Sequence, residues 1–333
     1  VRLGVKYAPY VRGKFVLSSD KKSVRTEDRF ITTDRSKMDR CDEKQRRGVW
    51  TRESLARTGL KIVMYNATAS LQKQPIRDNG VDVLVDSGGF QLRSGRTLFI
   101  DPRKVAMRHN VSGSIGISLD LPVTPAEQSI LLPRLTEMQR RNNEMFKKIL
   151  DTTVVEGMNV CHGFNLTARK RYLQGVWDPY FKRLAVAGLI GRPMQDIIAH
   201  MVWLITTLGD RVTHYHMLGV SGGQIFFTLA YLNKLFPSVL ISSDSSTYLM
   251  HAKNALFFNP ASFSSINFSK SAGSIRNQLT PSMRIPCSCE HCAGLGYVKA
   301  TLDGPAGLTL LWVFHNMREA TRRVDLVNDV VQN

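Results

Sequence analysis

Val81-Asp82-Val83-Leu84-Val85 leads directly into Asp86-Ser87-Gly88-Gly89-Phe90-Gln91. A short, valine-rich run that ends at polar residues and glycines is typical of a buried strand. Glycines directly after a strand let a flat ligand approach the backbone closely. The stretch therefore predicts a buried strand whose end carries a carboxylate, two glycines and an aromatic ring.

The pattern of a short apolar run followed by a helical stretch recurs along the chain. The eight predicted strands are Phe15–Leu17, Lys61–Tyr65, Val81–Val85, Ser114–Leu119, Met158–Cys161, Leu184–Val186, Tyr215–Leu218 and Val239–Ser242. Predicted helices between them include Glu127–Leu150, Met194–Leu208 and Gln224–Leu235. Alternating strands and helices favour a parallel sheet, and eight such units favour a (β/α)8 TIM barrel. An open doubly wound sheet is the alternative, although no Gly-x-Gly-x-x-Gly follows the first strand.

Polar residues and glycines stand where these predicted strands end. The strand ends carry Asp86, Asp120, His162-Gly163, Gly188, Gly219 and Asp244. In a barrel these positions share the carboxyl-terminal rim, where active sites are built. A single aspartate after a strand is more often a helix N-cap, Gly88-Gly89 alone is an ordinary turn, and Phe90 alone is core. The joint pattern instead favours one pocket lined by three carboxylates.

Three of the five cysteines fall within Cys287-Ser288-Cys289-Glu290-His291-Cys292. Thiolates at this spacing converge on one tetrahedral ion, and Zn²⁺ accepts a Cys3His ligand set. The fourth ligand is His291 or His315. We prefer His315, because His291 is squeezed between two ligands and His315 opens a helical-looking segment. Four protein ligands leave no open position, so Cys287, Cys289, Cys292 and His315 predict a structural zinc site, with Cys41 and Cys161 left as thiols.

The chain is strongly basic, with 45 Lys and Arg against 27 Asp and Glu and a formal net charge of +18. Such a field attracts polyanions, and nucleic acid is the first candidate partner. The alternative is a basic protein without such a partner. Val1–Lys6 lacks the apolar region of a secretory signal, and no stretch is apolar enough to span a bilayer. We therefore expect a cytoplasmic protein with no membrane segment and with reduced cysteines.

Several motifs occur in the order known from one enzyme family. Asp86 to Gln91 matches the Asp-Ser-Gly-Gly-aromatic-Gln signature of the tRNA-guanine transglycosylases. Ala185–Leu189 and Met217–Val220 resemble two further strand ends of that family, and Asp244 falls where it places its nucleophile. Cys-x-Cys-x-x-Cys followed by a distant histidine is similar to its zinc site. The resemblance extends over most of the chain.

The resemblance implies a TIM barrel over residues 1–270 and a zinc-binding subdomain with a C-terminal helix over residues 271–333. It implies that Asp244 attacks C1′ of a guanosine and that Asp86 acts as general acid and base. Asp120 would accept hydrogen bonds from guanine, with Phe90 and Leu218 stacked on the two faces of the base. The remaining implied base-binding residues are Ser87, His162, Gly188 and Leu189.

Two departures from the family point away from tRNA. Cys161-His162-Gly163 replaces the usual Gln-Gly-Gly, so that either His162 takes over a purine contact or the incoming base differs. Asp244-Ser245-Ser246-Thr247-Tyr248 replaces a nucleophile segment that contains Pro-Thr-Arg-x-x-Arg. The chain thus looks like the DNA-directed branch of the superfamily, whose members put 7-deazaguanine bases into DNA, notably in bacteriophages.

This branch implies DNA rather than tRNA as the partner, and a free, preQ0-like 7-deazaguanine base as co-substrate. A phage-encoded protein would act in the host cytoplasm, and the family also allows a homodimer. Three other hypotheses remain open at this point. They are a tRNA enzyme with a divergent tRNA-binding surface, a non-catalytic nucleic-acid-binding barrel subunit, and a simple glycosidase. The last explains neither the charge nor the cysteine cluster.

Overall fold

The computed structural model describes the following residues: 6–9, 16–17, 23–26, 29–32, 62–66, 82–89, 100–112, 115–122, 124–245, 251, 256–267, 287–289, 292 and 307–333. The chain divides into two compact units. The sheet unit contains residues 1–10, 61–245 and 326–333, and the cysteine unit contains residues 11–60 and 246–325. Residues 246–270 thus group with the cysteines, whereas the sequence-based division lies at residue 270. That these parts form two domains stays a prediction.

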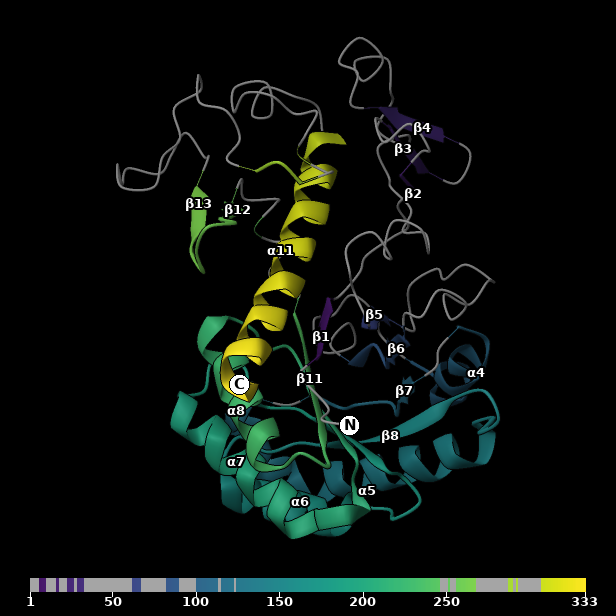
Figure 1. Ribbon diagram of the computed structural model, residues 1–333. Coiled ribbons are helices and arrows are strands. Elements are labelled where there is room, and N and C mark those ends of the chain that lie inside the picture. The colour runs from purple at the N-terminus through teal and green to yellow at the C-terminus, as the bar shows by residue number, and fades with distance from the viewer. Residues whose placement is uncertain are drawn as a thin grey trace. The chain divides into compact units, whose positions relative to one another are not determined.

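The sheet unit contains a parallel sheet with the strand order β1-β11-β10-β9-β8-β7-β6-β5. Its strands are β1 (Lys6–Pro9), β5 (Ile62–Asn66), β6 (Asp82–Asp86), β7 (Ile115–Ile117), β8 (Glu156–Cys161), β9 (Arg183–Val186), β10 (His214–Met217) and β11 (Leu240–Ser245). The six strands from β6 to β11 are neighbours in chain order and curl into a half-barrel (Figure 1). The predicted α/β class with a parallel sheet is confirmed.

The predicted first strand forms, but it does not belong to the parallel sheet as expected. Val16–Leu17 forms β2, which pairs antiparallel with β3 (Ser23–Thr26), and β3 pairs with β4 (Arg29–Thr32). The strand that joins the parallel sheet is instead β1, whose Ala8 pairs with Asp244 of β11. Antiparallel strands can be joined by a short turn, so β2 satisfies its backbone groups with residues nearby in sequence.

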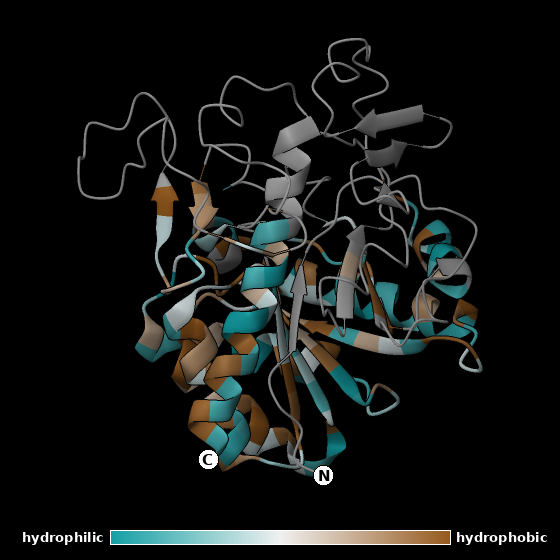
Figure 2. Cartoon of the chain, turned by 45° about the horizontal axis from the view of Figure 1, so that its top comes forward, coloured by the Kyte–Doolittle hydropathy of each residue, from teal (hydrophilic) through white to brown (hydrophobic). Residues whose placement is uncertain are grey.

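In the described part of the sheet unit, the strands are accompanied by the helices α4 to α8 (Figure 1). These helices are α4 (Pro102–Ser112), α5 (Pro125–Ile149), α6 (Leu166–Val176), α7 (Met194–Leu208) and α8 (Gly223–Leu235). The three predicted helices are confirmed as α5, α7 and α8. The start of α5 is fixed by a capping box, in which Thr124 Oγ1 accepts from the Glu127 amide and Glu127 accepts from the Thr124 amide. Apolar and polar residues alternate around the helices (Figure 2), as expected when one side packs on a sheet.

One face of the sheet carries an apolar core, and side chains at the ends of the strands continue this face. This core contains Met64, Leu84, Ile115, Ile117, Met158, Val160, Ala185 and Ala187, with Leu218 packed against it. These residues alternate along their strands, so they share one face. Continuing the alternation by two residues leads from Leu84 to Asp86 and from Val160 to His162. The apolar face therefore ends in polar side chains at the carboxyl ends of the strands.

The cysteine unit includes β12 (Leu256–Phe258) and β13 (Ser265–Asn267), which pair antiparallel, and most of α11 (Gly307–Gln332). Arg323 of α11 holds the turn between these strands, because its guanidinium donates to the carbonyls of Asn259, Ser262 and Ser264. It also lies over the Phe258 ring, 4.5 Å from the centroid. Among the helices in the described part of the chain, none has the length and apolar character needed to cross a membrane.

Candidate functional site

Three aspartates stand at three strand ends of the sheet unit. Asp86 is the last residue of β6, Asp120 follows β7, and Asp244 lies near the end of β11. The charges of Asp120 and Asp244 both raise the pKa of Asp86. Two carboxylates can exert that effect only at short range in a poorly hydrated site. The structure thus brings together the three carboxylates that the sequence placed on one rim.

Asp86 has a strongly altered acidity. Burial raises its pKa to about 7, and the negative charges of Asp120 and Asp244 add to this effect. Hydrogen bonds from the backbone of Gly88 and Ser87 oppose the shift without cancelling it. A carboxyl group with a pKa near 7 can both hold and release a proton at neutral pH, which is the property required of a general acid and base.

Asp120 is held by contacts on both its side chain and its backbone. Its Oδ1 lies 2.6 Å from His162 Nε2, and both residues are buried. Its backbone amide donates to Ser87 Oγ at 3.1 Å. A Cβ atom on Gly89 would lie 2.4 Å from the Asp120 carbonyl oxygen. The turn from Ser87 to Gly89 is therefore packed against Asp120, and only glycine fits at position 89.

Asp244 accepts two hydrogen bonds on the same oxygen. The Gly219 amide donates to Oδ1 at 2.8 Å, and His216 Nε2 lies 3.2 Å from it. Gly219 has φ +74°, a conformation that favours glycine, so the turn after β10 is shaped to aim its amide at the carboxylate. No donor among the described residues contacts Oδ2. Asp244 is thus anchored through Oδ1.

The ends of β8 and β9 are joined by a buried arginine. Arg169 of α6 donates to the carbonyls of Cys161, Gly163 and Ala187 at 3.0, 2.7 and 2.7 Å. Its Nε also donates to His200 Nδ1 at 3.1 Å. These carbonyls flank His162 and precede Gly188, so one side chain fixes the backbone of both strand ends.

The predicted base-binding residues occupy the expected strand ends, with one outside the described residues. Ser87, His162 and Leu189 are buried, Gly188 has φ +77°, and Leu218 packs on the sheet's apolar core. Phe90 lies outside the described residues. That these residues bind a base stays a prediction.

Two contributors to the site were missed by sequence reasoning. His216 was visible only as a polar residue in an apolar run, and Arg169 as one basic residue of a helix. A period-2 pattern gave a usable signal for the histidine, because His214, His216 and Leu218 alternate along one strand and end on the core face. Nothing in the local sequence marks Arg169, since three of its four partners are backbone carbonyls.

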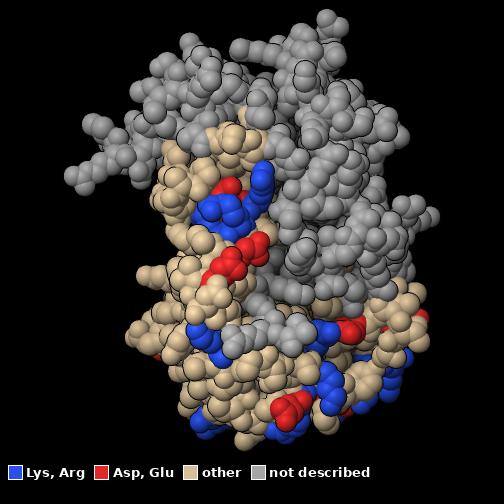
Figure 3. Space-filling view, viewed as in Figure 1, with Lys and Arg blue, Asp and Glu red and all other residues tan. Residues whose placement is uncertain are grey.

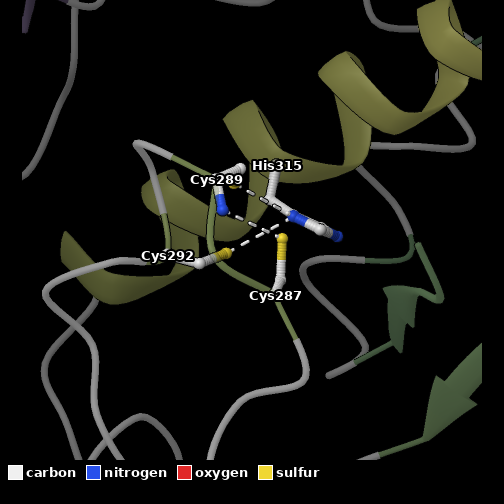
Figure 4. A group of neighbouring side chains, drawn as sticks. All are labelled: Cys287, Cys289, Cys292 and His315. Carbon is white, nitrogen blue, oxygen red and sulfur yellow. Dashed lines mark hydrogen bonds between the residues drawn. The ribbon is translucent and has the colours of Figure 1, made fainter. Parts of the chain in front are cut away.

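A second cluster, in the cysteine unit, brings together all four predicted metal ligands (Figure 4). The ligand atoms of Cys287, Cys289, Cys292 and His315 all lie within 4.8 Å of one another. Ligands of a tetrahedral zinc ion are separated by roughly 3.5–4 Å, given metal–ligand distances of 2.0–2.3 Å. The cluster therefore has the donor set and the spacing to hold a metal ion. His291 lies outside the described residues.

The orientation of His315 supports metal binding. Its Nδ1 lies 3.5 Å from Cys289 Sγ and 3.3 Å from Cys292 Sγ, and its Nε2 lies 2.8 Å from the Phe258 carbonyl oxygen. The carbonyl can only accept, so Nε2 carries the proton and Nδ1 presents its lone pair to the cysteines. The ring also stacks on Phe257, with centroids 3.7 Å apart. Such a partner on the second nitrogen is usual for metal-binding histidines.

No family model and no curated protein matches this chain. The chemistry of both sites is therefore inferred from the side chains themselves. The carboxylate site offers one anchored aspartate, one aspartate with a pKa near neutrality and one aspartate paired with histidine. The cysteine cluster offers a Cys3His donor set that could hold a metal ion.

Proposed function

We propose that this protein is a guanine transglycosylase that exchanges guanine in DNA for a 7-deazaguanine base through a covalent aspartyl-glycosyl intermediate. The observation that carries the proposal is the grouping of Asp86, Asp120 and Asp244, in which burial and neighbouring charge raise the pKa of Asp86 to about 7. A double displacement requires a nucleophile and a separate group that transfers a proton.

In the first step, Asp244 Oδ2 forms a bond to C1′ of the target nucleotide, and the bond between C1′ and N9 of guanine breaks. The electron pair of that bond leaves with guanine, which takes a proton from Asp86. In the second step, the incoming base gives its N9 proton to Asp86, and its nitrogen attacks C1′. The bond from C1′ to Asp244 then breaks, and the carboxylate is restored with no oxidant or cofactor consumed.

The other site residues would recognise the base. Asp120 offers acceptor oxygens for the N1–H and exocyclic amine of guanine, and its contact with His162 holds it in place. Leu218, and Phe90 if its ring reaches the pocket, supply apolar faces for stacking. Gly188 and Leu189 would bring backbone to the edge of the ring. His162 contacts Asp120 directly, so in this chain it would act on the purine through that carboxylate.

The proposal includes a complete (β/α)8 barrel and a structural zinc ion. The approach of β1 to β5, the two ends of the strand order, supports barrel closure. Cys287, Cys289, Cys292 and His315 would hold the zinc ion, which would stabilise the cysteine unit and take no part in base exchange.

DNA as the substrate is favoured by the net charge of +18, because phosphate neutralisation supplies much of the affinity for a duplex. On the face shown in Figure 3, the Lys and Arg residues of the described part lie among Asp and Glu rather than in one patch. The charge therefore indicates a partner class without indicating a surface. A guanine inside a duplex would have to be flipped out to reach Asp244.

The decisive experiment supplies labelled guanine or a labelled 7-deazaguanine base together with either DNA or tRNA. Label in DNA is the expected result. Label in tRNA alone would replace the DNA hypothesis with the tRNA hypothesis. Incorporation into neither, with several bases tested, would favour a non-catalytic nucleic-acid-binding barrel subunit.

The nucleophile is tested by trapping the covalent intermediate on a denaturing gel with labelled nucleic acid and no incoming base. Asp244→Ala should abolish the adduct. Asp210→Asn, a change at an exposed aspartate of the same unit, should leave it intact. An adduct that survives Asp244→Ala would show that another residue is the nucleophile.

A further inference from the structure

A continuous line of hydrogen bonds crosses the inner face of β9, β10 and β11 and ends at Asp244. Arg183 Nη1 lies 2.9 Å from His214 Nδ1, and His214 Nε2 lies 2.6 Å from Ser242 Oγ. Ser242 Oγ lies 2.7 Å from His216 Nδ1, and His216 Nε2 lies 3.2 Å from Asp244 Oδ1. We call these five residues the relay.

The strand register explains why these side chains meet. Arg183 pairs with His214 across β9 and β10, and His216 pairs with Ser242 across β10 and β11. Paired residues of neighbouring parallel strands point to the same face, and so do residues two apart on one strand. The relay therefore runs from the first residues of β9 and β10 to the carboxyl end of β11.

The direction of the first bond of the relay is defined, because its first member can only donate. The arginine guanidinium has no acceptor atom, so His214 Nδ1 must accept and His214 must carry its proton on Nε2. That proton goes to Ser242 Oγ. At the other end of the relay the Asp244 carboxylate can only accept, so His216 carries a proton on Nε2. A neutral His216 then has a bare Nδ1, which accepts the single proton of Ser242 Oγ. His214, His216 and Ser242 are buried, which shields this order from exchange with water.

We propose that the relay is a positioning device that fixes both histidines as neutral Nε2–H tautomers and aims a neutral donor at Asp244. With Gly219, it anchors Oδ1 and leaves Oδ2 to attack. A neutral donor suits a nucleophile, since a cation at that distance would stabilise the carboxylate before attack and so slow the reaction. The catalytic meaning of the relay rests on the proposed function, whereas its hydrogen-bond order does not.

The hydrogen-bond order is tested without activity by long-range ¹H–¹⁵N correlation of the eight histidines in the full chain. Spectra of His214→Gln and His216→Gln variants assign the two rings. Both should show the neutral Nε2–H pattern at neutral pH. A doubly protonated ring, or an Nδ1–H tautomer at either position, would overturn the proposal.

Arg183→Met tests the origin of the order, since it removes the donor at a position that keeps some exposure to solvent. The His214 Nδ1 resonance should move, and Arg183→Lys should restore it. Lys182→Met, which removes the neighbouring charge at an exposed position, is the matched control and should change neither ring. Unchanged histidine spectra in Arg183→Met would overturn the arginine's role.

The catalytic role is tested with Ser242→Ala, which breaks the relay at its centre. We expect kcat for base exchange to fall about tenfold to a hundredfold, with KM for the base little changed, because the relay touches the nucleophile and no base-binding residue. Ser242→Thr should recover much of the loss. If Ser242→Ala does not fold, Arg183→Met takes its place, with a smaller kcat loss expected and Arg183→Lys as the rescue. A rise in KM with kcat unchanged would refute the positioning role, and so would full activity. Intact tautomers in a protein that exchanges no base would refute the proposed function alone.

Discussion

Arg169→Met is the substitution that most directly probes how the site is held. The arginine is fully buried and donates to the carbonyls of Cys161, Gly163 and Ala187. A methionine of similar length fills the same space without donating, so the change isolates the hydrogen bonds from the volume.

The expected cost follows from those three acceptors. A buried acceptor that loses its partner costs about 1–3 kcal/mol. The three penalties do not add fully, because the neighbouring backbone shifts together, and the variant no longer has to keep a guanidinium out of water. We therefore expect the free energy of unfolding to fall by about 3–5 kcal/mol, less than the sum of three full penalties.

The assay is urea unfolding followed by the fluorescence of the four tryptophans, with the slope compared between variants. Arg171→Met is the control, because Arg171 lies on the same helix and is exposed, and its loss should change the free energy by less than about 0.5 kcal/mol. A loss below about 1 kcal/mol for Arg169→Met would refute the reasoning, since it would mean that these carbonyls find other donors.

Three further predictions concern the metal, acidity and packing. Purified protein should carry about one equivalent of zinc by elemental analysis, lost in His315→Ala and kept in Cys161→Ser; retention in the first variant would exclude His315 as a ligand. Because the pKa of Asp86 rises from 3.8 unfolded to about 7 folded, its protonated form stabilises the protein below pH 4, and this contribution is lost as the pH rises through 7. Asp86→Asn should therefore reduce the pH dependence of the free energy of unfolding between pH 4 and 7. An unchanged pH dependence would show that another group titrates in this range. Gly89→Ala should destabilise the fold by about 1–3 kcal/mol and reduce base binding by displacing Asp120, and a neutral result by thermal unfolding and base titration would contradict the packing.

The parts of the fold that depend on local sequence patterns could be predicted. Valine-rich runs such as Val81–Val85 predicted strands because a buried parallel strand is apolar on both faces. The cysteine spacing predicted the Cys3His cluster because three ligands lie in one short loop. The strand ends predicted three aspartates on one rim because parallel strands share an edge.

The rest depends on pairing across long distances in the chain. Phe15–Leu17 was not the first strand of the parallel sheet, because the choice between β1 and β2 depends on which backbone finds β11. The relay needs the register of three strands, and a shift of one residue would turn His216 and Ser242 to the other face. Three of the four partners of Arg169 are backbone carbonyls, which carry no side-chain identity for a sequence pattern to show.

The hydrogen bond from His315 to the Phe258 carbonyl has a thermodynamic consequence beyond orienting the ring. Asn316, the next residue of α11, bonds the Phe258 amide and the Leu256 carbonyl, so adjacent residues serve the metal cluster and β12. Ion binding and the order of β12 are then linked, and linkage is reciprocal. A substitution at Asn316, which offers no ligand atom, would therefore weaken metal affinity to the extent that it disorders β12. Bound metal would in turn favour the ordered form of this segment, so that the metal concentration would change how much of it is ordered.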